Sequence, residues 1–292
     1  MLKRKALRKI FITTLSMLII LTIYTIPTTQ KENVLRTNLE IEDITNLATD
    51  KIYLVNKDNY LVKTDVFIDS NKKIEKIIDY LTISNDKIPS NLNGYIPKDT
   101  KLINYNIESN SLVLNFSKEF KNSNNEEILI TGIVYSLLEL PNIKEVSIQV
   151  EDKFYKDYTN LNKNIGINNN IVYTNRKDIS KVVTYYLDET DNYYVPVTNY
   201  VNDNREKIEI ISDSLKETKK GLISYISENT KLLDYQEDNN LLILNFSKEL
   251  KNENKLSEDK ILNTISYSVF DNYDVNMVLF QIEGETYKYI KR

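Results

Sequence analysis

Two identical polar runs stand far apart in the chain, at Asn115-Phe116-Ser117 and Asn245-Phe246-Ser247. Recurring amide and hydroxyl groups could form a polar binding site, and both runs match the N-x-S glycosylation acceptor. Each run, however, ends a segment in which apolar and polar residues alternate, which is typical of a strand with one buried face. We interpret Phe116 and Phe246 as core residues and the following Ser-Lys-Glu as the opening of a helical turn. No catalytic or binding role is assigned to either run.

Two acidic or polar clusters have ligand types that suit calcium, Asn56-Lys57-Asp58-Asn59 and Asp188-Glu189-Thr190-Asp191. Neither cluster has the glycine and the distant glutamate of an EF-hand loop. Both occupy matched positions between expected strands, where Asn and Asp favour turns. We interpret them as hairpin turns and predict no metal site.

The residue types that are missing exclude several classes of enzyme. The chain has no His and no Cys, which removes the usual zinc and copper ligands and the Ser-His and Cys-His nucleophile systems. Its five glycines form no G-x-G or P-loop pattern. We therefore expect no enzymatic activity, no catalytic residues and no cofactor. The 21 tyrosines leave open an alternative, the binding of peptidoglycan or a peptide by stacking.

The N-terminus has the pattern of a membrane anchor. Five cations precede an uncharged stretch from Ile10 to Ile26, which is near the lower limit for crossing a bilayer. Cations before such a stretch stay in the cytoplasm, so residues after Pro27 are expected outside the cell membrane. A cleaved signal peptide is the alternative, but no small-x-small site precedes Thr28. The absence of Cys also excludes a lipid-modified anchor.

The expected exported part is acidic. Without the five N-terminal cations, 33 basic residues stand against 42 acidic ones, a net charge of about −9. Such a surface repels phosphate backbones, and no stripe of Lys and Arg compensates for it. The sequence therefore predicts no nucleic-acid partner.

An internal repeat organises the rest of the chain. Residues 100–124 recur 130 positions later as residues 230–254, with 15 of the 25 positions identical. The match extends downstream, where Val146, Ile148 and Val150 align with Val278, Phe280 and Ile282. Upstream, Tyr53-Leu54 is aligned with Tyr186-Leu187. We predict an anchor at 1–27, a stalk at 28–49, a first domain at 50–156, a linker at 157–180 and a second domain at 181–292.

The linker is expected to be flexible because residues 159–178 are polar and Asn-rich. Burial of Ile165, Ile167, Ile171 and Val172 in an ordered loop is the alternative.

Periodicity predicts the elements of each module. In the first copy, Ile74, Ile77, Ile78 and Leu81 form the stripe of an amphipathic helix with Ser70 as its N-cap. A second helix carries the stripe of Ile130, Ile133, Val134, Leu137 and Leu138, with Asn125 as its N-cap, and Ser257 is expected to cap its counterpart. With the strands, each module is predicted to be β-β-α-β-β-α-β. This gives an α+β fold whose mixed sheet carries two helices on one face.

The same residues resemble a known family. The Ile96-Pro97-x-x-Thr100 turn, the Leu112–Phe120 strand and the helix that leads to Pro141 are similar to the GerMN domain of sporulation and spore germination proteins. Two tandem copies cover nearly all of the expected exported chain. The chain departs from the family where Asn115 and Asn245 replace the usual Asp, and where Ser227 replaces Pro97 in the second copy. The helix and strand order is also similar to that of ring-building-motif domains.

The resemblance implies a function in assembly. We expect a single-pass extracytoplasmic protein of the cell membrane that acts as a scaffold in sporulation or spore germination. Its expected partners are envelope or sporulation-complex proteins, with self-association allowed.

Overall fold

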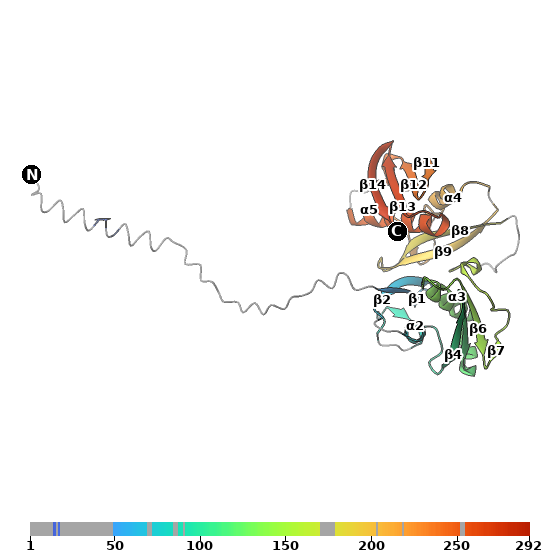
Figure 1. Cartoon of the computed structure of the whole chain (residues 1–292). Helices are drawn as coiled ribbons and strands as arrows, with labels where there is room; N and C mark the ends of the chain where they lie inside the picture. Colours follow the sequence, from blue (N-terminus) through green and yellow to red (C-terminus); the bar gives the residue numbers. More distant parts are fainter. Residues whose placement is uncertain are drawn as a thin grey trace, which may run out of the picture. The chain divides into compact units, whose positions relative to one another are not determined.

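The computed structural model describes residues 14, 15, 17, 49–68, 72–83, 87–89, 91–169, 179–202, 204–217, 219–251 and 255–292. Residues 48–292 form one compact unit, which contains both repeats (Figure 1). Of the predicted anchor, only Thr14, Leu15 and Met17 are among the described residues, and all three are helical. No helix within the described ranges is both long enough and apolar enough to cross a membrane.

The first module contains an antiparallel sheet and a mixed sheet. Strands β1 (Asp50–Asn56), β2 (Leu61–Val66) and β3 (Leu92–Asn93) form the first sheet in the order β2-β1-β3. Strands β4 (Leu102–Glu108), β5 (Ser111–Phe116), β6 (Glu145–Val150) and β7 (Lys153–Phe154) form the second, in which β5 and β6 are parallel. Helix α2 (Lys73–Leu81) follows β2, and helix α3 (Glu126–Leu137) connects β5 to β6.

The second module repeats this order. Strands β8 (Ser180–Asp188), β9 (Tyr194–Val201) and β10 (Leu222–Ile223) form the antiparallel sheet. Strands β11 (Leu232–Asp238), β12 (Leu241–Phe246), β13 (Met277–Ile282) and β14 (Glu285–Lys291) form the mixed sheet. Its helices are α4 (Lys207–Ser214) and α5 (Lys255–Asn272). The fold is α+β with two tandem modules, as predicted. The strands of each module divide between two sheets instead of forming one.

The core of each module follows the predicted periodicities. Leu112, Leu114 and Phe116 of β5 are buried, and so are Leu242, Leu244 and Phe246 of β12. The long helices pack against the antiparallel sheets, α3 on β1 and α5 on β8. The stripes predicted for α2 and α3 lie in the core, except that Leu138 is half-buried.

The helix caps agree with the prediction in one case and differ from it in two. The side chain of Asn125 accepts a hydrogen bond from the backbone N–H of Ile128, so Asn125 is the N-cap of α3 as predicted. Ser257 is not a cap, because α5 already begins at Lys255. Ser70 is not the cap of α2 either, because the N-cap position of this helix belongs to Lys72, whose side chain forms no capping hydrogen bond; Ser70 itself lies outside the described residues.

The upstream alignment of the two modules was wrong by one residue. The backbone N–H of Tyr53 donates to Ser136 Oγ, and that of Tyr185 donates to Ser268 Oγ. Tyr53 therefore corresponds to Tyr185, 132 positions later, and not to Tyr186. Since neighbouring strand residues point to opposite faces of a sheet, the predicted alignment placed each residue of β1 on the wrong face of β8.

The described part of the predicted linker is packed. Leu161 bridges to Val146, and residues 163–165 form a short 3₁₀ turn. Ile167 is buried, and its backbone N–H donates to Thr198 Oγ1 of β9. Residues 159–169 thus match the ordered-loop alternative, whereas residues 170–178 lie outside the described ranges.

Candidate binding cleft between the two modules

The repeated Asn-Phe-Ser runs are bonded within their own modules. Phe116 and Phe246 are buried, as predicted. Asn115 accepts a hydrogen bond from the backbone N–H of Asp152, and Asn245 accepts one from Gly284, so each side chain holds the turn after the next strand. The two serines accept hydrogen bonds from the backbone N–H groups of Lys101 and Lys231 across the hairpins. The recurrence of both polar residues therefore has a structural cause.

The two acidic or polar clusters are hairpin turns, as predicted. Asn56 Oδ1 accepts hydrogen bonds from the backbone N–H groups of Asp58 and Tyr60, at 3.0 and 2.9 Å. Asp188 Oδ1 does the same for Asn192 and Tyr193. These side chains replace backbone partners in the turns, which explains why oxygen-bearing residues recur there.

Equivalent tyrosines join the modules reciprocally. The Tyr60 hydroxyl donates to the carbonyl of Lys220, just before β10, at 2.9 Å. The Tyr193 hydroxyl donates to Asn91 Oδ1, just before β3, at 3.2 Å. Tyr60 and Tyr193 directly precede the equivalent strands β2 and β9, so each module contacts the other through the same residue, close to the other module's short third strand. This is the geometry of a twofold interface between two like units.

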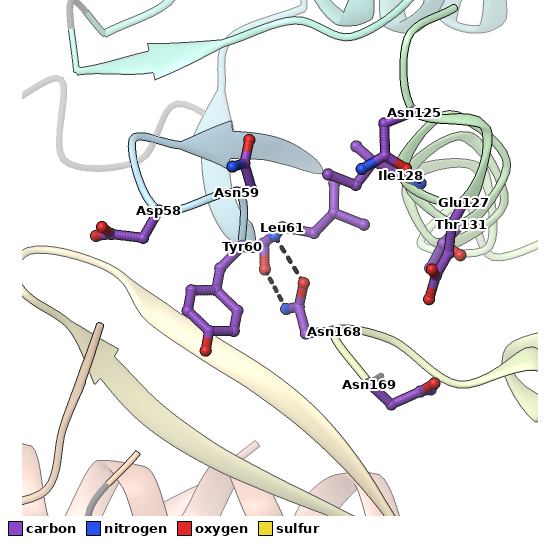
Figure 2. Close-up of a pocket in the computed structure, with 10 residues that line it drawn as sticks. All are labelled: Asp58, Asn59, Tyr60, Leu61, Asn125, Glu127, Ile128, Thr131, Asn168 and Asn169. Carbon is purple, nitrogen blue, oxygen red and sulfur yellow. Dashed lines mark hydrogen bonds between the residues drawn. The ribbon is translucent and has the colours of Figure 1, made fainter. Parts of the chain in front are cut away.

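A second link lies beside a small polar cavity of about 220 Å³, which Figure 2 shows. The cavity lies between the β1–β2 turn and the start of α3, and Asn168 forms part of its wall. The Asn168 amide donates to the carbonyls of Leu61 and Pro196, both at 2.7 Å, and accepts from the Leu61 N–H at 2.8 Å. One side chain thereby bonds to β2 of the first module and β9 of the second.

A larger cleft of about 400 Å³ is lined by both modules. Its lining combines five cations, three carboxylates and four aromatic rings: Lys51, Lys63, Lys163, Lys291, Arg292, Asp65, Glu139, Asp271, Tyr185, Tyr194, Tyr267 and Phe270. The cleft therefore has a local excess of positive charge. By contrast, the chain without its five N-terminal cations is acidic, with a net charge of about −9.

Glu139 and Asp271 hold equivalent places in the cleft. The Tyr53 hydroxyl lies 3.4 Å from Glu139 Oε1, and the Tyr185 hydroxyl donates to Asp271 Oδ2 at 2.7 Å. Burial raises the pKa of both tyrosines, and the neighbouring carboxylates raise it further. The hydroxyls therefore remain protonated donors at neutral pH.

Two lysines form ion pairs with Glu139 in the first module. Glu139 binds Lys63 at 2.9 Å and Lys163 at 3.2 Å. Burial alone would raise the pKa of Glu139, but the charges and hydrogen bonds of the two lysines outweigh it and hold the pKa below its usual value. Tyr53 pairs with Lys63 across the strands, whereas Tyr185 pairs with Pro196. The duplicated modules have thus diverged at the cleft.

Aromatic rings form the other wall of the cleft. Tyr267 packs edge-on against Tyr194, with 4.9 Å between ring centroids, and lies 5.7 Å from Tyr185. Tyr267 is partly exposed, so its ring is accessible from the cleft. Tyrosines beside lysines suit an anionic ligand with a ring or an apolar face.

Sequence reasoning missed this cleft because its lining comes from segments spread between Lys51 and Arg292. One signal could have found part of it. At a spacing of 132, Tyr53, Ser136 and Glu139 recur as Tyr185, Ser268 and Asp271. The predicted alignment of Tyr53 with Tyr186 concealed this triad.

Comparisons with known proteins define the class. The model of the Germane family, described as sporulation and spore germination, matches residues 51–156 and 183–288. The chain therefore belongs to this family, with two tandem domains.

A named relative is the spore germination protein GerM of Bacillus subtilis strain 168. It is 25% identical over 264 residues, which cover 81% of this chain and 72% of GerM. The solved tandem GerMN domains of the sporulation protein GerM from Bacillus subtilis match with a TM-score of 0.72 and 22% identity. That match covers 84% of this chain and 96% of the solved chain. The structural match shows that the folds are alike.

Proposed function

We propose that the chain is a membrane-tethered extracytoplasmic scaffold with a GerM-like role in sporulation or spore germination. The family supports a role in one of these processes. The reciprocal tyrosine contacts support the scaffold, because they hold two similar modules in one compact unit. Such a unit offers a partner complex two related surfaces at a fixed spacing, which raises the effective concentration of the second contact.

The tether is proposed from the N-terminal pattern of cations followed by uncharged residues. The full-length chain should sediment with membranes, and protease added to protoplasts should remove everything beyond about Pro27. Recovery of a protein that starts near residue 28 from the culture medium would replace the tether with a cleaved signal peptide.

The scaffold is tested by cross-linking in cells that express the full-length chain. We expect capture of envelope or septal proteins, and loss of capture when either module is deleted. The deletion should also disturb the captured complex. Because the modules share an interface, each deleted chain must first be shown to fold by its circular dichroism and thermal melting.

Binding of an envelope glycan or peptide is the second candidate, and the cleft favours it. Its exposed Tyr267 ring and neighbouring lysines suit an anionic, ring-bearing ligand. Retention on purified peptidoglycan that falls at least tenfold in Tyr267→Ala would support this candidate. The matched control is Tyr289→Ala, which removes an exposed ring from β14. Capture on glycan alone, with one module sufficient, would exclude the scaffold.

A further inference from the structure

Strands β4 and β11 form exposed edges at equivalent places in the two modules. Each is the first strand of its mixed sheet (Figure 1), and in each every residue after the first is exposed. Within the described ranges, β4 pairs only with β5 and β11 only with β12. The outer edge of each strand therefore presents backbone N–H and C=O groups to which another strand can bond.

A bulge limits the regular part of each edge. The pairing register shifts between Leu102 and Asn104 in the first module, and between Leu232 and Asp234 in the second. The regular segments are thus Asn104–Glu108 and Asp234–Asp238, which we call the first and second edge segments. Their sequences are NYNIE and DYQED.

We propose that two copies of the chain associate by antiparallel pairing of their first edge segments, about a twofold axis at Asn106. An interface of this symmetry requires a surface that is complementary to itself. In this register Tyr105 lies opposite Ile107 of the second copy, and Asn106 lies opposite Asn106. Aromatic side chains opposite β-branched ones stabilise antiparallel strands.

The exposure of these side chains fits that arrangement. Tyr105 is 36% exposed and Ile107 is 44% exposed. Because the pairing is reciprocal, Tyr105 and Ile107 of each copy are covered by the other copy. Asn104 lies opposite Glu108, so no like charges face each other.

The charges of the second edge segment explain why we assign the pairing to the first edge segment. The same register would place Asp234 opposite Asp238 and Tyr235 opposite Glu237. Six carboxylates would then share ten residues, compared with two carboxylates in the first segment. Like charges directly opposite each other destabilise a strand pair, and charges on an edge strand commonly prevent pairing. The chain thus combines one self-complementary edge with one self-repelling edge.

The absence of Cys from the chain permits a direct test in the full-length protein in its membrane. Asn106→Cys places a thiol on the proposed axis, where directly opposed Cα atoms lie about 4.5–5.5 Å apart, within disulfide range. We expect mild oxidation to produce a disulfide-linked dimer. The matched control Gln236→Cys, at the equivalent place in the second edge segment, should give at least tenfold less dimer. Equal yields from the two variants, no dimer from Asn106→Cys, or a disulfide to a different protein would overturn the proposal.

A second set of variants separates association from folding. In the Asn106→Cys chain, Asn104→Asp with Ile107→Glu introduces the carboxylates of the second edge segment. We expect at least a tenfold slower formation of the dimer, because the carboxylate introduced at position 104 would face Glu108 and the one introduced at position 107 would face Tyr105. Ile107→Val should form the dimer at the parent rate. Thermal melting measured under reducing conditions shows whether each variant is folded, and an unchanged dimer rate in the folded double variant would contradict the pairing.

Discussion

The backbone N–H of Tyr53 donates to Ser136 Oγ at 2.9 Å, and this bond joins a buried strand to a buried helix. Both residues are almost fully buried. Tyr185 and Ser268 form the same bond, at 2.8 Å, in the second module. A serine facing the middle of a strand is therefore part of the architecture of each module.

Replacement of Ser136 by Ala is expected to destabilise the protein by about 1–3 kcal/mol, because the buried N–H of Tyr53 loses its acceptor. Ser268→Ala should have an effect of similar size. Both are measured as the free energy of unfolding in urea. The control is Ser111→Ala in β5, for which we expect a change below about 0.5 kcal/mol. Equal effects at positions 111 and 136 would show that the hydrogen bond is not what stabilises the strand.

The repeated strands give a second prediction. Phe116 is fully buried and stacks on Phe120, with 4.4 Å between ring centroids. Phe116→Ala and Phe246→Ala should each cost about 3–5 kcal/mol of unfolding free energy, since each leaves a cavity in the core.

The exposed lysines two residues later are the matched controls for these substitutions. Lys118→Ala and Lys248→Ala should change the unfolding free energy by less than about 0.5 kcal/mol. If the lysine variants fold normally but lose function in sporulation or germination, the repeated run is a functional site after all.

Much of the fold could be predicted because local pattern determines it. The period of two in Leu112, Leu114 and Phe116 defined a strand, and Asn125 before two acids defined the start of a helix. The start of α5 at Lys255 was missed because serine is a favourable N-cap residue, so Ser257 was taken as the cap. Local preference alone does not choose between neighbouring positions for the start of a helix.

The cleft and the module interface could not be predicted because they depend on tertiary packing. Tyr60 and Tyr193 are ordinary residues at the end of a turn until each meets the other module. The separation of each module into two sheets likewise depends on which strands pair. The alternation of apolar and polar residues shows which face of a strand is buried, but not which strand lies beside it.

Lys181 gives a prediction for alkaline pH. It lies near the cleft and donates to the carbonyl of Lys163, and burial lowers its pKa to about 8. In the unfolded chain a lysine titrates near 10.4, so between these values the unfolded state binds more protons than the folded state. Stability should therefore rise with pH over this range, by about 1–2 kcal/mol between pH 7.5 and 9.5. Urea unfolding at both pH values measures the change.

The rise in stability with pH should end at about pH 10 because of Tyr53 and Tyr185, whose pKa values are raised in the folded protein. They contribute stability that is lost above about pH 10, where tyrosines ionise in the unfolded chain. In Lys181→Met the rise between pH 7.5 and 9.5 should disappear. The control Lys118→Met, at an exposed lysine, should retain it. A rise that persists in Lys181→Met would assign the effect to another group.

Limited proteolysis tests how the modules are joined. The sequence predicts cleavage between Thr159 and Asp178, and the structure narrows this range because residues 159–169 are packed against both modules. We expect cuts within residues 170–178 only, giving two fragments of similar size. The fragments should elute together in gel filtration, because the bonds of Tyr60, Tyr193 and Asn168 cross the interface.

Tyr60→Phe with Tyr193→Phe removes both reciprocal hydroxyl bonds while keeping the rings, and should weaken co-elution of the cut chain. Tyr289→Phe, on the outer strand β14, should leave co-elution unchanged. Fragments that separate in the parent protein but remain folded would mean that residues 170–178 alone keep the modules together.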